Sequence, residues 1–287
     1  MDAFRIDGPT AISFSGGRTS AFMLWKVLET HGGLPKDAVI CFANTGLEHE
    51  NTLRFVERCG QEWGVPINWL EYRTNEVGYE AVNFATASRN GEPFEAIIKK
   101  RNYLPNPVTR FCTSELKIRT MHKWLRNNWE ALGWDAADME WDQMIGIRSD
   151  ENRRVTKIRA RGHSTETTKE TMRMPLADAG YSVQDVNEFW SKQPFNLELD
   201  TFNGRTLAGN CVLCFLKPAA QIQSLIREDP SRGVWWAKME LTSLASKPSG
   251  AVFRSDRPSY QKMMDFSRDQ VDMFDANEEG IACFCGD

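Results

Sequence analysis

The feature that most constrains this chain is a repeated order of short apolar strands and amphipathic helices near its beginning. Hydrophobic periodicity predicts strands at 10–14, 38–43 and 66–72, with helices at 18–31 and 50–62 between them. Strands and helices that alternate in this way form parallel sheets with right-handed crossovers. The chain is therefore predicted to be an α/β protein with a parallel-stranded, Rossmann-like sheet flanked by helices.

The loop between the first strand and the first helix contains two adjacent glycines and three hydroxyl side chains. Ligands of open parallel sheets bind beyond the carboxyl ends of the strands, where this loop is expected to lie. Glycines let the backbone approach a ligand, and the N–H groups at a helix N-terminus attract anions. A plain tight turn would also use glycine, but the strand–loop–helix setting favours phosphate binding. The residues expected to contact the ligand are Ser15, Gly16, Gly17, Arg18, Thr19 and Ser20.

The rest of the chain divides into two predicted parts. A helix is predicted at 114–132 and a buried strand at 141–147, followed by a basic segment at 148–173 that we expect to be a partly mobile loop. Helical patterns dominate from about residue 182, with a glycine-bearing interruption near 200–211. We therefore expect a nucleotide-binding α/β domain over 1–180 and a mostly helical region with cysteine motifs over 181–287.

The glycine loop differs from both common nucleotide motifs, because it lacks the Gly-Lys-Ser/Thr end of the Walker loop and the Gly-x-Gly-x-x-Gly spacing. Ser-Gly-Gly-x-x-Ser after a first strand resembles the PP-loop of the HUP-type ATP pyrophosphatases, which split ATP between its α and β phosphates. Three later segments resemble the branch similar to phosphoadenosine phosphosulfate (PAPS) reductase. They read FANTGLEHENTL at 42–53, TRFCTSELKI at 109–118 and GIRSDENRR at 146–154. The four motifs span about the first 155 residues.

This resemblance implies a site for ATP. The triphosphate would lie on the glycine loop, and the segment Asn44, Thr45 and Gly46 would line the adenosine pocket. Cleavage releases pyrophosphate, whose charge needs fixed cations or Mg²⁺. We expect Arg110 and Lys117 to act as catalytic cations, with Arg148 as a further binding residue. Each could instead be an ordinary surface charge. The carboxylates of Glu48 and Asp150 could hold Mg²⁺.

Seven cysteines, an odd number, do not suggest a disulfide framework. Cys41 and Cys59 are predicted to be small buried hydrophobes. The Cys-x-x-Cys at 211–214, the Cys-x-Cys at 283–285 and Cys112 could together supply four thiolates to a metal. A capping turn with buried thiols is the alternative explanation of the Cys-x-x-Cys.

The resemblance implies which metal group these thiols would bind. Sulfur-handling relatives carry a [4Fe-4S] cluster, among them the adenylylsulfate reductases and the ATP pyrophosphatase of DNA phosphorothioation systems, to which this chain is similar. This resemblance implies that the cluster ligands are Cys112, Cys211, Cys214 and Cys283. Cys285 is the alternative fourth ligand, and zinc is the alternative metal. In a PAPS reductase a C-terminal cysteine attacks sulfur, so Cys285 is also a candidate nucleophile.

Charge and hydropathy limit the location and partners. The net charge of −4 gives no global basic field. No apolar run approaches the ~20 residues of a membrane span, and residues 1–5 do not begin a secretory signal. We expect a cytoplasmic protein with no membrane partner, binding an adenine nucleotide and, beyond it, nucleic acid or a sulfur-donor protein, in a homodimer. The basic segment 148–173 could meet a polyanion or gather the phosphates of a small nucleotide.

Three functions follow as hypotheses. The first is an ATP pyrophosphatase that adenylates an acceptor for sulfur transfer, which would be thiolation of nucleic acid or of a small molecule. The second is an oxidoreductase that reduces PAPS or adenylylsulfate. The third is a nucleotide-binding regulatory module without turnover.

Overall fold

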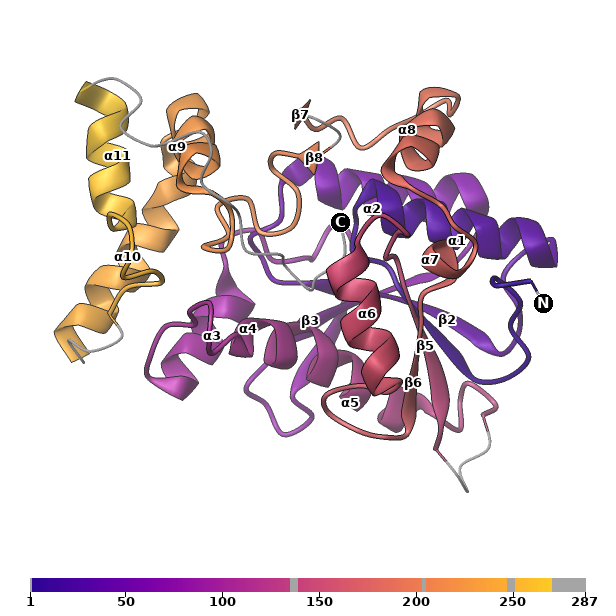
Figure 1. The fold of residues 1–287 in the computed structure, drawn as a ribbon. Helices are drawn as coiled ribbons and strands as arrows, with labels where there is room; N and C mark the ends of the chain where they lie inside the picture. The colour runs from indigo at the N-terminus through magenta and orange to yellow at the C-terminus, as the bar shows by residue number, and fades with distance from the viewer. Residues whose placement is uncertain (1, 135–138, 203–204, 247–250, 270–287) are drawn as a thin grey trace.

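A computed structural model describes residues 2–134, 139–202, 205–246 and 251–269 (Figure 1). Its centre is a six-stranded sheet with the strand order β4-β3-β2-β1-β5-β6. All neighbouring strands are parallel except β4, which runs antiparallel to β3. This confirms the predicted α/β fold. The strands are β1 (Thr10–Ser13), β2 (Ala38–Asn44), β3 (Ile67–Tyr72), β4 (Tyr79–Val82), β5 (Trp141–Ile145) and β6 (Glu170–Arg173).

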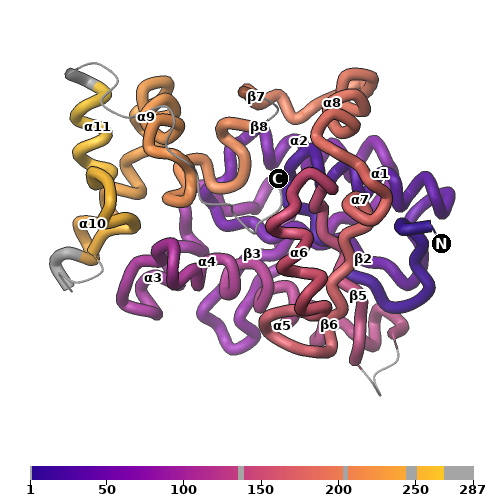
Figure 2. The backbone as a smooth tube through the Cα atoms, viewed as in Figure 1, coloured from indigo at the N-terminus to yellow at the C-terminus, as the bar shows by residue number. Residues whose placement is uncertain are grey.

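Helices cover both faces of the sheet, as Figures 1 and 2 show. Successive side chains of a strand point to opposite faces, so β1 places Ile12 in one apolar cluster and Ala11 in another. The first cluster is shared with α1 (Arg18–His31), α2 (Glu50–Trp63) and α8 (Val183–Ser191). The second is shared with α5 (Arg119–Asn128), and α6 (Asn152–Arg161) packs beside it over β5 and β6.

The order of the strands sets where a ligand can bind. From β1 the chain builds outward through β2 to β3, and it later returns to place β5 on the other side of β1. The sheet therefore has a topological switch point between β1 and β5. In open α/β sheets a crevice forms there, outside the carboxyl ends of the two strands.

The basic segment 148–173 was expected to be a partly mobile loop, and this prediction is wrong. The segment contains α6 and the edge strand β6. Val155 and Ile158 on α6 pack with Ile147 and Met174 in a small apolar cluster, which anchors the helix to the sheet. Its remaining positions are mostly charged and largely face solvent, so the helical period is hidden by a high average polarity.

Two further helical stretches lie before β5. The first is α3 (Glu92–Arg101), which has a proline in its first turn, where the missing N–H is tolerated. The second begins with α4 (Phe111–Thr113), continues as a π-helical turn at Ser114–Ile118, here called the π turn, and ends as α5. It corresponds to the helix predicted at 114–132.

The C-terminal region is mostly helical, as predicted. A short α7 (Pro175–Asp178) precedes α8, a two-stranded hairpin follows with β7 (Thr201–Phe202) and β8 (Arg205–Thr206), and three helices come last. They are α9 (Ala219–Glu228), α10 (Ser231–Ser246) and α11 (Tyr260–Asp269). Their apolar cluster includes Trp236 and Tyr260 and also Phe94 and Leu116 of the earlier chain, so the two parts share a core. No described helix is long and apolar enough to cross a membrane.

Candidate functional site

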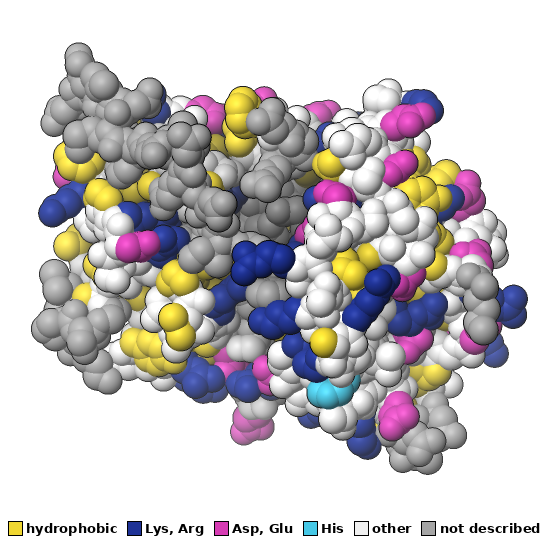
Figure 3. Space-filling model, viewed as in Figure 1, with side chains coloured by type: hydrophobic (Ala, Val, Ile, Leu, Met, Phe, Trp, Pro, Cys, Tyr) yellow, Lys and Arg dark blue, Asp and Glu magenta, His cyan; other side chains and the backbone are white. Residues whose placement is uncertain are grey.

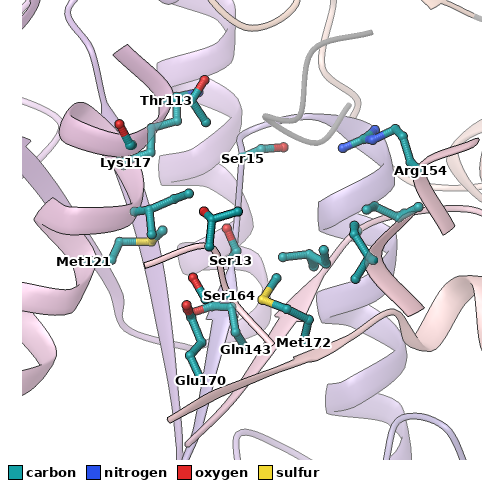
Figure 4. A pocket seen from close by; sticks show the side chains of 18 of the residues that line it. Ser13, Ser15, Thr113, Lys117, Met121, Gln143, Arg154, Ser164, Glu170 and Met172 are labelled. Atoms are coloured by element: carbon teal, nitrogen blue, oxygen red, sulfur yellow. The ribbon is translucent and has the colours of Figure 1, made fainter. Parts of the chain in front are cut away.

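A cavity of about 570 Å³ opens at the switch point of the sheet (Figure 4). The carboxyl ends of β1 and β5 line it together with the loop before α1, the π turn, α5 and α6. Its volume lies within the range of small-molecule sites. The cavity is therefore where the fold predicts a ligand to bind.

The glycine loop forms one edge of this cavity through Ser15 and Ser20. The Ser20 hydroxyl accepts a hydrogen bond from the Ser15 N–H at 3.1 Å, lies 2.8 Å from the Ser15 hydroxyl and donates to the Gly17 carbonyl at 3.0 Å. These bonds curl the loop tightly. No side-chain hydrogen bond caps α1 at Gly17, so N–H groups of the first helical turn remain for an anion.

Gly16 is required by the shape of the loop. Its φ of +78° is in the left-handed region, and a Cβ atom there would lie 2.7 Å from the Thr52 Cγ2 atom. Any side chain would therefore push the loop away from α2. Gly16 and Gly17 do not themselves line the cavity, so their part in phosphate binding stays a prediction.

Arg18 and Thr19 also lie outside the cavity lining. The Arg18 carbonyl accepts a hydrogen bond from the Trp190 indole at 2.9 Å, and burial lowers the pKa of the Arg18 guanidinium. Thr19 accepts from the Arg148 Nη1 atom at 3.1 Å. Arg148 also pairs with Asp150 at 3.0 Å, so it ties the exit of β5 to the start of α1. A ligand contact by these residues is not shown.

Five cationic side chains line the cavity and meet there from three segments of the chain. Arg110 lies just before α4, Lys117 lies on the π turn, and α6 contributes the rest, namely Arg154, Lys157 and Arg161. Figure 3 shows Lys and Arg side chains gathered across this face, over and beside α6. Glu170 is the one acidic residue in the described lining. The electrostatics of the cavity therefore favour an anionic ligand.

Arg110 and Lys117 were predicted from the sequence, whereas the three cations of α6 were missed as site residues. They had been assigned to a loop, in which spacing has no structural meaning. Positions 154, 157 and 161 are separated by three and four residues, which places them on one side of a helix. This spacing was the signal that could have identified them.

The segment Asn44-Thr45-Gly46 has its side chains committed to the protein itself. Asn44 donates to the Glu71 carboxylate at 2.5 Å and to the Ser88 carbonyl at 2.9 Å. Thr45 donates to the Glu48 carboxylate at 2.9 Å from its N–H and from its hydroxyl. Ala43 is the residue of β2 that lines the cavity. The Gly46 N–H donates to the Asn44 Oδ1 atom at 3.1 Å, and the Gly46 carbonyl accepts from the Gly91 N–H at 2.8 Å, so much of the backbone of this segment is engaged as well.

Three of the predicted metal ligands fall within the described residues. Cys211 lies 3.3 Å from the Thr45 hydroxyl, and its backbone is bridged to Glu48. Burial and then the Glu48 carboxylate raise the pKa of the Cys211 thiol, and Cys112 and Lys117 are near enough to act on it electrostatically. Cys214 is buried in the C-terminal apolar cluster.

The described thiols do not by themselves make a metal site. Within residues 2–134, 139–202, 205–246 and 251–269, no three His, Cys, Asp or Glu side chains are grouped to hold a metal ion. Cys283 and Cys285 lie outside the described residues. The [4Fe-4S] cluster and its zinc alternative therefore stay predictions that need the C-terminal cysteines. Cys41 and Cys59 are buried, as predicted.

The chain is similar to two curated proteins, both of which are named as uncharacterized. No protein-family model matches the chain. It is 29% identical over 219 residues to an uncharacterized nin region protein of Escherichia phage lambda, covering 74% of this chain and 67% of that one. It is 25% identical over 237 residues to an uncharacterized protein of Methanocaldococcus jannaschii, covering 82% of this chain and 42% of that one. The chain thus spans about two thirds of one relative and less than half of the other.

Among the solved structures that the chain resembles at a low level is a reductase. It is the phosphoadenylyl-sulfate (PAPS) reductase of Candida auris in its phosphate complex. The TM-score is 0.41 at 10% identity, with 69% of this chain and 81% of that chain covered. A likeness of this size does not identify an activity.

Proposed function

We propose that this chain is an ATP pyrophosphatase of the PP-loop type, which adenylates an acceptor so that sulfur can be introduced. The observation that carries the proposal is the composition of one cavity. At the switch point of the sheet, the hydroxyls of the Ser-Gly-Gly loop and five cationic side chains line the same space. A polyphosphate on that loop would meet positive charge from the π turn on one side and from α6 on the other.

The chemistry follows from this arrangement of charge. An oxygen of the acceptor attacks the α-phosphorus, the bond to the β-phosphate oxygen breaks, and the acceptor becomes linked to AMP while pyrophosphate leaves. The charge that develops on pyrophosphate is stabilised by the cations that line the cavity. Lys117 and Arg110 lie on the side of the π turn, and Lys157 and Arg161 lie on the side of α6. A sulfur nucleophile from a donor then displaces AMP from the acceptor.

The described residues offer few available ligands for Mg²⁺. Glu48 is engaged by Thr45, Asp150 pairs with Arg148, and the described residues contain no grouped set of metal ligands. Mg²⁺ keeps several waters and is commonly bound through substrate phosphates with one or two carboxylates. It is therefore expected to arrive with the triphosphate, whose charge it neutralises.

Reduction of a sulfonucleotide is the second candidate, and one observation favours it. Cys211 lies close enough to both Lys117 and Cys112 to interact electrostatically, and Lys117 lines the cavity. A thiol therefore lies near a residue of the space proposed for the nucleotide. In this reaction a cysteine thiolate attacks the sulfur of the bound sulfonucleotide, the nucleotide leaves, and a second thiol releases sulfite from the cysteine.

The test is to measure both products with one set of variants. Wild type, Ser20→Ala and Lys117→Met would be assayed for nucleotide binding, for pyrophosphate released from ATP in the presence of mixed RNA, DNA or small-molecule acceptors, and for sulfite released from PAPS with a dithiol. Ser191→Ala, an exposed serine on α8, is the matched control.

Pyrophosphate release that depends on Ser20 and Lys117 supports the pyrophosphatase, and sulfite release supports the reductase. Nucleotide binding with neither product leaves the regulatory module as the function. Absence of nucleotide binding in the wild type would refute all three.

A further inference from the structure

One part of the cavity lining is polar and contains no Lys or Arg side chain. This part, here called the floor, is the sheet itself, where β1, β5 and β6 present Ser13, Gln143 and Glu170, with Ser164 from the loop before β6. Figure 4 shows these side chains gathered below Ser15, Lys117 and Arg154. The floor differs in chemistry from the part of the cavity beside Lys117 and Arg154, because it offers oxygen atoms where these two residues offer positive charge.

Gln143 is the most informative residue of this floor. Its side-chain Nε2 atom donates to the Ala11 carbonyl at 3.1 Å. A carbonyl can only accept, so this bond fixes which end of the amide is which. The Gln143 Oε1 atom is buried and has no hydrogen-bond partner among the described residues, in a side chain that is 3% exposed and lines the cavity. A buried acceptor without a donor is costly, and a bound ligand can supply that donor.

Glu170 is a second acceptor beside Gln143. In the parallel pairing of β5 and β6, Glu170 lies opposite Trp141, and Gln143 lies opposite Met172. Since side chains alternate along a strand, Gln143 and Glu170 are diagonal neighbours on the same face. His122 of α5 lies 2.9 Å from one oxygen of the Glu170 carboxylate, and both residues are buried. This contact fixes the carboxylate at the inner end of the cavity.

Two neighbouring acceptors select a group that carries N–H donors. The walls beside them are apolar, with Ile118 and Met121 on one side and Met172 on the other. Such walls suit a flat heteroaromatic ring better than a charged amine. The five cations that line the cavity also disfavour a positively charged ligand. An aromatic amine attached to an anionic group satisfies both ends of the cavity.

The two ends are separated by a length that a nucleotide can span. Gln143 pairs with Ala11 in the sheet, and Ser15 follows Ala11 by four positions. At about 3.3 Å per residue, the floor and the loop are at most about 13 Å apart along β1. A nucleotide in an extended conformation, with hydrogen bonds at its phosphate and at its base, bridges such a distance.

We infer that the cavity floor recognises the exocyclic amino group of the nucleobase, with the Gln143 Oε1 atom as its acceptor and Glu170 as the second. This inference rests on the proposed function, since it takes the nucleotide on the loop to be ATP. The base thus lies along β5 and β6 and not at Asn44-Thr45-Gly46, where the resemblance implied the adenosine pocket and where the side chains bond within the protein. Gln143 makes the site selective for adenine over a purine that lacks the amino group.

The test compares ATP with two analogues. Purine riboside triphosphate lacks the amino group, and inosine triphosphate carries a carbonyl in its place. The dissociation constants of the three nucleotides would be measured for wild type, Gln143→Met and Glu170→Gln. We expect wild type to bind ATP at least about tenfold more tightly than either analogue, because the analogues leave buried acceptors unpaired. In Gln143→Met the preference should fall to about twofold or less.

Gln223→Met is the matched control. Gln223 is also buried, donates from Nε2 to a backbone carbonyl at 2.9 Å and leaves its Oε1 atom without a partner, but it lies in α9 away from the cavity lining. A general loss of packing would weaken all three nucleotides alike in either variant. Only a role in base recognition changes the ratio of the dissociation constants of ATP and its analogues.

Each outcome bears on a different claim. Equal binding of ATP and both analogues by the wild type overturns the inference and leaves the proposed function standing. An unchanged preference in a folded Gln143→Met also overturns it. If the wild type binds none of the three nucleotides, the proposed function fails, and the inference fails with it.

Discussion

Replacing Gly16 with alanine tests whether the loop is shaped by contact with α2. The φ of +78° is unfavourable for alanine by about 1–2 kcal/mol. The new Cβ would also lie 2.7 Å from the Thr52 Cγ2 atom, 3.1 Å from Val56 Cγ2 and 3.2 Å from Phe42 Cε2. These neighbours are buried, so overpacking should add about 1–3 kcal/mol. Gly16→Ala is therefore expected to lower the free energy of unfolding by about 2–5 kcal/mol, measured by urea denaturation.

Gly64→Ala separates the two contributions. Gly64 has a φ of +61°, and a Cβ atom added there would meet no other atom within 4 Å, so its substitution should cost only the backbone part, about 1–2 kcal/mol. Thr52→Ser removes the Cγ2 atom, and the double variant Gly16→Ala with Thr52→Ser should recover part of the loss beyond additivity. The reasoning is refuted if Gly16→Ala costs no more than Gly64→Ala, or if the double variant shows no recovery.

Three further predictions concern charge and protonation. Lys117→Met should weaken ATP binding about tenfold or more in titrations at fixed salt, because a charge-assisted contact is lost, whereas Lys192→Met at the C-terminal end of α8 should have no effect. The His49 Nδ1 atom accepts from the Asn51 N–H at 3.1 Å and caps α2, and burial lowers the pKa of His49 below 6.5. The unfolded chain therefore binds a proton at a higher pH than the folded chain does, so protonation should lower the free energy of unfolding as the pH falls below about 6.5. His49→Asn, which keeps a cap, should flatten that part of the curve of stability against pH. Burial raises the pKa of the Cys41 thiol to about 12, so iodoacetamide at pH 8 should leave Cys41 unmodified in the native protein and alkylate it after denaturation; rapid labelling of the native protein would contradict its burial.

Much of the fold could be predicted because it is encoded in short stretches of sequence. The helix predicted at 18–31 is α1, and the strand predicted at 38–43 is β2 to within one residue. In both, the apolar spacing alone defines the element. Arg110 and Lys117 could be named as well, because they belong to a motif that resembles a family pattern, and the structure places both at the cavity.

Other features escaped prediction because they depend on partners far apart in sequence. Asn44 was expected to contact the nucleotide, but its side chain bonds to Glu71 and Ser88, contacts that no local pattern reveals. The helix α6 was missed because only a few of its positions are apolar. These positions are buried only because α6 packs on the sheet, which the local sequence does not reveal.

By itself, the sequence determined the order of strands and helices over residues 10–72 and the Ser-Gly-Gly loop between the first two elements, since both follow from local periodicity and backbone preference. Only the tertiary structure decided that β5 pairs with β1, which creates the switch point and joins Ser15 to Gln143 in one cavity. It also decided that Glu170 meets His122, 48 positions earlier in the chain. The physical reason is that strand pairing and cross-sheet hydrogen bonds are chosen by the packing of the whole domain, which no single segment encodes.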